Sequence, residues 1–388
     1  MSRMIPYAKQ DISDGDIDSV IEVLKSDFLT QGNKVPLFED IISERVGAKY
    51  ALAANSATSC LYLSCLSLGL SKEDILWTSP ITYVASANCA LYCGAEVDFV
   101  DIDPLTWNIS VEILEEKLKT ARKIKKVPKI LVLVHLAGNP CDLQKVFDLS
   151  KEYGFSIIED ASHALGSKYS GEHIGSSVYS DISVFSFHPV KNITTGEGGM
   201  ILTNNQKLSE KIHLYRSHGI TRDTKKMINK EEGLWYYEQL LLGFNFRMSD
   251  IHAALGISQM NSLDKFISKR NELSQIYTEE LKGLPLTIQR VRKEDLSAWH
   301  IFVIRLKLSE LKLSRLEIYN SLRNKGIGVN VHYIPVHLHP FYKNLGFNKG
   351  DFPNSENYYD GAITIPMFTK LKKKEIKYVI QALKESIK

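Results

Sequence analysis

The sequence predicts an α/β protein whose main sheet has seven mostly parallel strands, followed by a smaller α+β domain. Short apolar segments alternate with helical or loop segments over the first 205 residues. This alternation is typical of a parallel sheet that helices cover on both faces. The run ILVLV at 130–134 is apolar at every position, as expected of a strand buried on both sides. After residue 205 the alternation stops, and a second α+β pattern begins near residue 260.

The elements of the large domain follow from this pattern. A helix is expected over 13–24, because apolar residues recur at helical spacing from Ile17 to Leu24 and Ser13 is a suitable N-cap. Seven buried strands are expected at 50–53, 75–78, 97–100, 130–134, 156–158, 182–187 and 200–203. Helices between them are expected at 57–68, 86–92, 111–118 and 142–152.

The C-terminal part has a different pattern. Residues 206–260 are expected to be largely helical, with a polar, aromatic interruption at 219–246. Further elements are expected as a long amphipathic helix from 261, a strand at 299–306, and helices at 313–325 and 373–388. We therefore expect a large domain at 1–260 and a small C-terminal domain at 261–388.

Composition excludes several classes of protein. The chain of 388 residues has 48 Lys and Arg against 45 Asp and Glu, a formal net charge of +3. That balance argues against binding to nucleic acid or to an anionic membrane. No apolar run approaches the roughly 20 residues needed to span a bilayer. The N-terminus turns acidic at once and lacks the apolar core of a signal peptide, so we expect a cytoplasmic protein.

The five cysteines do not indicate a disulfide framework or a metal site. Their number is small and odd, and reduced thiols fit a cytoplasmic protein. Cys89 and Cys93 have the spacing of one helical face, but no second Cys or His pair with ligand spacing accompanies them. We expect these thiols to serve packing, and we expect no metal.

Lys191 is the candidate nucleophile. In the segment SVFSFHPVKNITTGEGGMILTN (183–204) a strand ends, a Pro-containing loop presents Lys191, and glycines precede the next strand. A single lysine is most often a surface charge, but this one emerges from a buried framework. Burial lowers the pKa of a lysine and makes its amine a nucleophile for carbonyl compounds. The glycines allow a ligand to approach the backbone closely.

Asp160 is a candidate partner for a ring nitrogen. It ends the segment IIED (157–160), at the edge of the sheet where ligands of open α/β proteins bind. Because Lys191 follows a strand at the same edge, both side chains can reach one crevice. A carboxylate beside a pyridine nitrogen keeps that nitrogen protonated and makes the ring an electron sink. The alternative is that Asp160 only caps a helix at 161–164.

The segment AANSATSCLYLS (53–64) contains a candidate phosphate site. Free N–H groups and small hydroxyls open a helix at Ala57 and Thr58 and would bind an anion, although ordinary Ser/Thr capping is the alternative. The sequence has neither G-x-G-x-x-G nor a P-loop, which argues against dehydrogenases and kinases. An anion site, a carboxylate, a lysine and a flat aromatic side chain, Tyr83, are the parts of a pyridoxal phosphate site.

An ordered series of motifs resembles the DegT/StrS-type nucleotide-sugar aminotransferases. The resemblance runs from end to end of the chain and implies fold type I of the pyridoxal phosphate (PLP)-dependent transferases, a homodimer and a transaminase activity of class EC 2.6.1. The motifs are DFLTQGNKVPLFE (27–39), NSATS (55–59), EDASHALGS (159–167), FSFHPVKNITTGEGG (185–199), LGFNFRMSDIHAALG (242–256) and GIGVNVHYIPVHLHPFY (326–342).

The resemblance implies roles for individual residues. Lys191 would be the catalytic lysine that bonds to the cofactor, and Asp160 would pair with the pyridine nitrogen. His163 would stand near the ring hydroxyl, Tyr83 would stack on the ring, and Asn245 would reach the phosphate bound by the partner subunit. The phosphate contacts of the same subunit would be Ala57, Thr58 and Ser186. The substrate contacts would be Tyr7, Phe28, Leu29, Thr30, His332, Tyr333 and His337, with a strand-end histidine and a loop cap as equal alternatives for His332 and His337.

The substrate expectation also rests on the resemblance. LTQG (29–32), NSATS and WYYEQ (235–239) are similar to family members that aminate C4 of a UDP-linked 4-keto-6-deoxy-N-acetylhexosamine in pseudaminic acid biosynthesis. L-glutamate is the expected amino donor, with ping-pong kinetics because both half-reactions share one site. A related 4-aminotransferase for a bacillosamine, perosamine or aminoarabinose precursor remains open. A PLP-binding regulator would need basic DNA-binding helices, which we do not find, and a binding module without PLP would be colourless.

Overall fold

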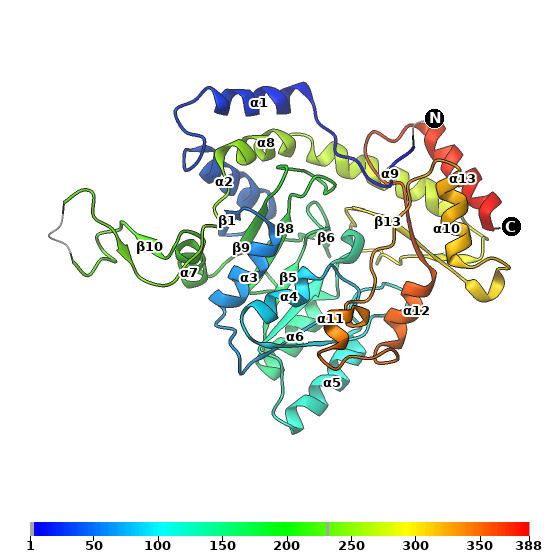
Figure 1. Ribbon diagram of the computed structural model, residues 1–388, viewed down its shortest axis with the longest axis horizontal. Coiled ribbons are helices and arrows are strands. Elements are labelled where there is room, and N and C mark those ends of the chain that lie inside the picture. The colour runs from blue at the N-terminus through cyan, green and yellow to red at the C-terminus, as the bar shows by residue number, and fades with distance from the viewer. Residues whose placement is uncertain (1–3, 230–232, 388) are drawn as a thin grey trace.

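A seven-stranded sheet forms the centre of the computed structural model, which describes residues 4–229 and 233–387 (Figure 1). The strands lie in the order β1-β9-β8-β5-β4-β2-β3, and only β9 runs antiparallel to its neighbours. Their bounds are Tyr50–Ala54 (β1), Ile75–Thr78 (β2), Glu96–Phe99 (β3), Ile130–Val134 (β4), Ser156–Asp160 (β5), Ile182–Ser186 (β8) and Gly199–Thr203 (β9). The predicted fold class and mostly parallel sheet are confirmed, with strand ends that differ by at most two residues.

Helices cover both faces of this sheet because its strands are apolar on both sides. In β4, Leu131 and Leu133 pack in the core on one face, and Ile130 and Val132 pack in the core on the other. The first face is covered by α2 (Lys34–Val46), α5 (Val111–Lys123), α6 (Leu143–Tyr153) and α8 (Asp250–Met260). The second is covered by α3 (Ala57–Ser67), α4 (Ala85–Tyr92) and α7 (Gln206–Arg216).

The N-terminal helix α1 (Asp14–Leu24) begins where the sequence predicts it. The Ser13 hydroxyl accepts the N–H of Asp16 at 3.2 Å, and the Asp16 carboxylate accepts the N–H of Ser13 at 2.8 Å. This reciprocal capping fixes the first turn. Helix α1 then packs along α8, at the top of Figure 1.

A second, smaller sheet lies in the C-terminal part and confirms the predicted α+β pattern there. It consists of β12 (Leu286–Ile288), β13 (Phe302–Leu306) and β14 (Ala362–Ile365), all antiparallel. It packs against α9 (Leu263–Glu280), α10 (Arg315–Asn324) and α13 (Lys373–Ile387). The predicted last residue of the final helix, 388, lies outside the described residues.

Helix α9 connects the two cores. Leu263 and Ile267 pack in a core of the main sheet, whereas Leu273 and Tyr277 pack in the core of the small sheet. The domain boundary near residue 260 therefore stays a prediction. The N-terminal segment, predicted with the large domain, contacts the small one through a backbone bridge between Ile5 and Ile327.

The predicted interruption at 219–246 is a projecting extension. Strand β10 (Ile220–Thr221) pairs with β11 (Glu238–Gln239), and this hairpin stands away from the body at the left of Figure 1. The remaining short elements are β6 (Lys168–Tyr169), β7 (Glu172–His173), α11 (Pro340–Lys343), α12 (Pro353–Gly361) and 3₁₀ turns at Leu136–Gly138, Leu308–Glu310 and Val336–Leu338. In the described part of the chain, no helix combines the length and apolar character needed to cross a bilayer.

Candidate active site

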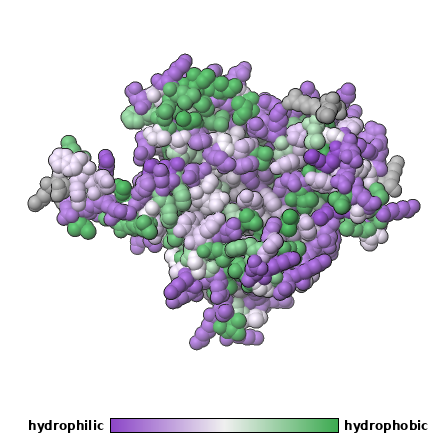
Figure 2. All heavy atoms as spheres, viewed as in Figure 1, coloured by the Kyte–Doolittle hydropathy of each residue, from purple (hydrophilic) through white to green (hydrophobic). Residues whose placement is uncertain are grey.

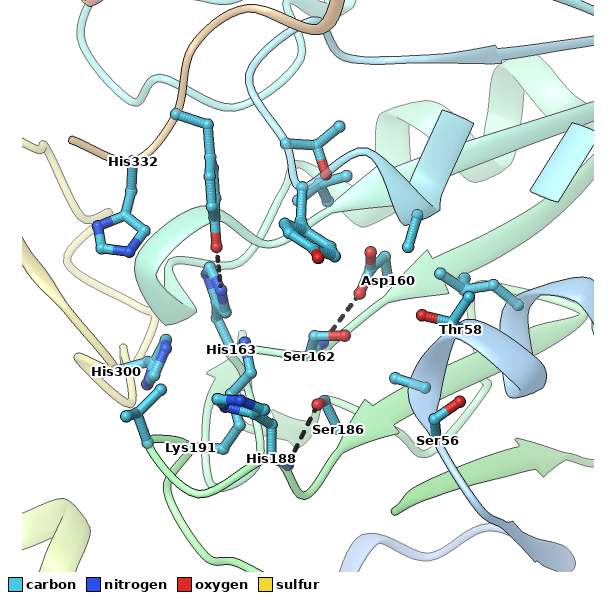
Figure 3. Close-up of a pocket in the computed structure, with 18 of the residues that line it drawn as sticks. Ser56, Thr58, Asp160, Ser162, His163, Ser186, His188, Lys191, His300 and His332 are labelled. Atoms are coloured by element: carbon cyan, nitrogen blue, oxygen red, sulfur yellow. Dashed lines mark hydrogen bonds between the residues drawn. The ribbon is translucent and has the colours of Figure 1, made fainter. Parts of the chain in front are cut away.

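A pocket of about 330 Å³ opens at the carboxyl edge of the main sheet. Strands β5 and β8 end there in Asp160 and Ser186, and helix α3 begins there at Ala57. The opposite wall comes from the C-terminal part of the chain, with His300 and His332 on the other side of the pocket from Asp160 and Thr58 (Figure 3). The pocket therefore lies between the large sheet and the smaller one.

The pocket brings together ten of the fifteen site residues that the sequence analysis predicts. These are Tyr7, Ala57, Thr58, Tyr83, Asp160, His163, Ser186, Lys191, His332 and Tyr333. Phe28, Leu29, Thr30 and Asn245 lie on exposed loops outside the pocket lining. Their roles stay predictions.

His337 also lies outside the pocket lining. Its ring is buried, and its Nε2 is 3.0 Å from Oε1 of Glu356, on α12. This pairing joins two segments of the C-terminal part, and the role of His337 stays a prediction.

Lys191 lies in the loop between β8 and β9. Burial lowers the pKa of its ammonium group to about 8, and the negative charge of Asp160 limits that fall. The backbone fixes the loop, since Lys191 N donates to His188 O at 2.9 Å and Thr195 N donates to Phe187 O at 3.0 Å. With this pKa, Lys191 is an uncharged, nucleophilic amine in about one tenth of the molecules at pH 7.

Asp160 is the last residue of β5 and is buried at the base of the pocket. Its Oδ1 accepts the N–H of Ser162 at 3.1 Å, and its Oδ2 accepts the hydroxyl of Ser86 at 2.6 Å. The following residues, 161–164, form a turn rather than a helix. The alternative that Asp160 caps a helix is therefore wrong.

The neighbouring carboxylate, Glu159, points to the other face of β5, as alternation along a strand requires. Its Oε2 is 2.9 Å from Nε2 of His135, and its Oε1 accepts hydroxyls of Ser180 at 2.5 Å and Ser183 at 3.0 Å. His135 Nδ1 accepts the N–H of Cys141 at 3.0 Å, so Nε2 carries the hydrogen and donates to Glu159. Glu159 is thus enclosed by donors, while Asp160 lines the pocket.

The N-terminus of α3 supplies an anion site. The Ser56 hydroxyl accepts the N–H of Ser59 at 3.1 Å, while helix geometry leaves the N–H groups of Ala57 and Thr58 without an intrahelical acceptor. Gly199 lets the helix start against strand β9, since a Cβ there would lie 2.7 Å from Ala57 N. Together with the hydroxyls of Thr58 and Ser186, these donors fit a phosphate group.

A backbone peptide orients two histidines that come from different walls, His163 from the loop after β5 and His300 from the C-terminal part. His163 Nδ1 accepts the N–H of Ala137 at 3.2 Å, so Nε2 carries the hydrogen and donates to the Tyr333 hydroxyl at 3.1 Å. The carbonyl of Ala137 accepts the N–H of His300 at 3.0 Å. Ala137 has a φ of +60°, an uncommon value for a residue with a side chain, and it contacts both histidines from this conformation.

These two histidines and His332 are uncharged at neutral pH. Burial, with the nearby charge of Lys191, lowers the pKa of His332 to about 4. Burial also lowers the pKa values of His163 and His300 well below the ordinary range. Burial raises the pKa of Tyr333, so its hydroxyl stays protonated. These side chains therefore offer neutral hydrogen-bonding groups to the pocket.

The sequence analysis missed several residues of the lining, namely Ser56, Thr82, Ser162, His188, Glu197 and His300. Thr82 is next to Tyr83 in the sequence, and this is the signal that could have pointed to it. No local signal marks His300, because its place depends on the packing of the C-terminal part against Ala137.

Comparisons with known proteins agree with this geometry. Residues 10–384 match the DegT/DnrJ/EryC1/StrS aminotransferase family. The chain is 39% identical over 383 residues to the UDP-4-amino-4,6-dideoxy-N-acetyl-beta-L-altrosamine transaminase of Campylobacter jejuni serotype O:23/36, covering 98% of this chain and 96% of the relative.

Two solved structures extend the likeness to the fold. Helicobacter pylori PseC, an aminotransferase involved in the biosynthesis of pseudoaminic acid, superposes with a TM-score of 0.89 at 32% identity, covering 99% of each chain. The PLP form of the sugar aminotransferase Spr1654 from Streptococcus pneumoniae superposes with a TM-score of 0.88 at 28% identity, covering 99% of this chain and 98% of the other.

Proposed function

Because the chain belongs to the DegT/DnrJ/EryC1/StrS aminotransferase family, it is a sugar aminotransferase, and we propose that PLP is its cofactor. The observation that carries the proposal is the meeting of a lysine of lowered pKa, a strand-end carboxylate and an open helix N-terminus in one pocket. PLP supplies a carbonyl that takes up an amino group and a ring that withdraws electrons from the bond being broken.

Each residue of the sheet-edge wall has a role in this proposal. Lys191 would hold the cofactor through Nζ, and its free amine would move a proton at that atom during the exchange of amino groups. Asp160 pairs with the ring nitrogen, His163 stands near the ring hydroxyl, and Tyr83 stacks on the ring. The phosphate is held by Ala57, Thr58 and Ser186.

We propose that L-glutamate donates the amino group and that C4 of a UDP-linked 4-keto-6-deoxy-N-acetylhexosamine accepts it, a step of pseudaminic acid biosynthesis in the cytoplasm. The support is the 39% identity to the Campylobacter transaminase. Tyr7, His332 and Tyr333 lie in the pocket as the proposed sugar contacts. A 4-aminotransferase for another nucleotide sugar is the alternative.

A homodimer is part of the proposal. Asn245, Phe28, Leu29 and Thr30 are exposed and lie outside their own pocket lining, so they serve a site only if an interface brings them to the pocket of a second copy. Exposed apolar side chains lie near them, on α1 and on the projecting hairpin: Ile17, Ile21, Leu24, Leu234, Trp235 and Leu242. The part of this surface over α1 is the green patch at the top of Figure 2.

The cofactor proposal is tested on the purified protein. We expect it to be yellow, and borohydride reduction followed by peptide mass spectrometry should place the cofactor mass on Lys191. Mass on another lysine, or none, would contradict the cofactor assignment.

The substrate proposal is tested with a panel of UDP- and dTDP-linked 4-keto sugars. A site that hydrogen-bonds an acetamido group leaves its own polar groups unpaired when that group is missing, which can lower kcat/KM by about 10⁴-fold. Faster turnover of dTDP-4-keto-6-deoxyglucose than of the acetamido sugar would overturn the substrate assignment and leave the aminotransferase activity standing.

The dimer proposal is tested by mixing two variants. Lys191→Ala and Asn245→Ala are each expected to be weak or inactive alone, but a mixed dimer contains one site with both residues intact. Activity should therefore reappear after subunit exchange. No recovery after verified exchange would place the effect of Asn245 within its own subunit.

A further inference from the structure

Asp160 is held by a chain of two hydroxyl groups to which the proposed function gives no role. The Ser86 hydroxyl lies 2.6 Å from Asp160 Oδ2, and the Thr82 hydroxyl lies 2.7 Å from that of Ser86. Both side chains are buried, with relative exposures of 0% for Ser86 and 2% for Thr82. Thr82 also lines the pocket.

The direction of both hydrogen bonds follows from the chemistry of the groups. An ionised carboxylate only accepts, so the single hydrogen of Ser86 goes to Asp160. The distance of 2.6 Å is typical of a hydroxyl that donates to a charged oxygen. Ser86 can then only accept from Thr82, and the Thr82 hydrogen points toward Ser86 rather than into the pocket.

This arrangement fixes the plane of the carboxylate. Ser162 N donates to Oδ1 and Ser86 donates to Oδ2, so each oxygen has one donor and the group cannot turn about its last bond without losing both. Ser86 is the second residue of α4, and its hydroxyl points to Asp160 rather than to a carbonyl of its own helix. With Thr82 Oγ1 as its donor, Ser86 is held in this orientation.

We propose that Ser86 and Thr82 are positioning residues, which hold the Asp160 carboxylate in the orientation that pairs with the cofactor's ring nitrogen. This inference rests on the proposed function. Ser86 acts directly on Asp160, and Thr82 acts through Ser86, so removing Ser86 has the larger effect.

The test compares Ser86→Ala with Ser64→Ala. Ser64 is an equally buried serine on the neighbouring helix α3, and its hydroxyl donates to Cys60 O at 2.7 Å, away from Asp160. Ser86→Ala should lower kcat by about ten- to hundredfold, the range for losing a hydrogen bond to a charged group, with KM for both substrates within about twofold. The pH at which the absorbance of the bound cofactor titrates should also shift by about one unit. Ser64→Ala should change neither quantity.

A second pair of variants keeps the test independent of folding. Thr82→Val removes the hydroxyl but keeps the shape of the side chain. It should lower kcat by about three- to tenfold, the range expected for the loss of one neutral hydrogen bond. Thr82→Ser keeps the hydroxyl, and its kcat should equal that of the wild-type enzyme. If Ser86→Ala does not fold, this pair decides.

The outcomes separate this inference from the proposed function. A wild-type protein that binds PLP, with Ser86→Ala or Thr82→Val indistinguishable from Ser64→Ala in kcat and absorbance, would overturn only the positioning role. A wild-type protein that shows no bound PLP would overturn the proposed function and this inference with it.

Discussion

The two walls of the pocket differ in charge. The sheet-edge wall carries the Lys191 amine and the Asp160 carboxylate beside the open N-terminus of α3. The opposite wall carries His300, His332 and Tyr333, all uncharged at neutral pH because burial shifts their pKa values away from it. Charge is thus concentrated on the wall where bonds would change, and neutral donors and acceptors suit the recognition of sugar hydroxyls. Substitutions on the first wall should lower kcat, and those on the second should raise KM.

The largest effect is expected at Lys191. Lys191→Ala removes both the amine that bonds to the cofactor and the proton carrier, so kcat should fall by at least about 10⁴-fold. Turnover is measured by the glutamate-dependent appearance of the amino sugar, with circular dichroism as the check on folding. Activity within tenfold of wild type would remove Lys191 from the chemistry.

Asp160→Asn should have the second largest effect. An amide does not stabilise a protonated ring nitrogen, so kcat should fall by about 10²–10³-fold while the absorbance of bound cofactor remains. Near-normal kcat would contradict the pairing with the ring nitrogen.

The neighbouring Glu159→Gln is the matched control for Asp160→Asn. Glu159 lies on the other face of β5 and is enclosed by His135, Ser180 and Ser183. Its substitution disturbs a buried hydrogen-bonded charge and should lower the melting temperature, with kcat of the folded enzyme within about threefold.

The opposite wall is tested by Tyr333→Phe. The hydroxyl of Tyr333 accepts from His163, so its own hydrogen is free to donate to a ligand. Loss of one such bond should raise KM for the sugar nucleotide by about tenfold, with kcat within about threefold. A fall in kcat at unchanged KM would instead place Tyr333 in the chemical step.

The smallest effect is the contrast in pH dependence between the walls. The pKa of Lys191 is lowered to about 8, so its uncharged fraction, and the rate at which cofactor-free protein captures PLP, should rise about fivefold from pH 7 to pH 8. The pKa of His332 is lowered to about 4, so this side chain stays neutral between pH 6 and pH 8. KM for the sugar nucleotide should therefore be constant within about twofold over that range. A KM that changes near pH 6.5 would show that a histidine of this wall titrates in the ordinary range.

The same two walls show what the sequence could predict. All seven strands of the main sheet, the strand-end residue Asp160 and the loop residue Lys191 follow from local apolar patterns and from the rule that ligands bind at the carboxyl edge. The role of Ser186 came from the resemblance to a family. Helix α2 was missed although Val35, Phe38, Ile42 and Val46 recur at helical spacing, and β12 is too short to give a periodic signal.

The rest of the site depends on contacts between distant segments. His300 reaches the pocket through the carbonyl of Ala137, and Ser86 reaches Asp160 across 74 positions of the chain. No local spacing encodes such a pairing. His332 and Tyr333 were found only through the resemblance to a family, whereas Lys191 and Asp160 could be argued from their own neighbourhoods.

Helix α9 has a mechanical consequence for the pocket. One end of this helix is embedded in a core of the main sheet and the other in the core of the small sheet. Midway, Arg270 Nη1 donates to the carbonyls of Trp299 at 3.1 Å and His300 at 2.9 Å. The helix therefore connects the two walls of the pocket rigidly. A hinge motion that opened the pocket would have to bend α9. The width of the pocket available to a ligand is therefore set when the chain folds.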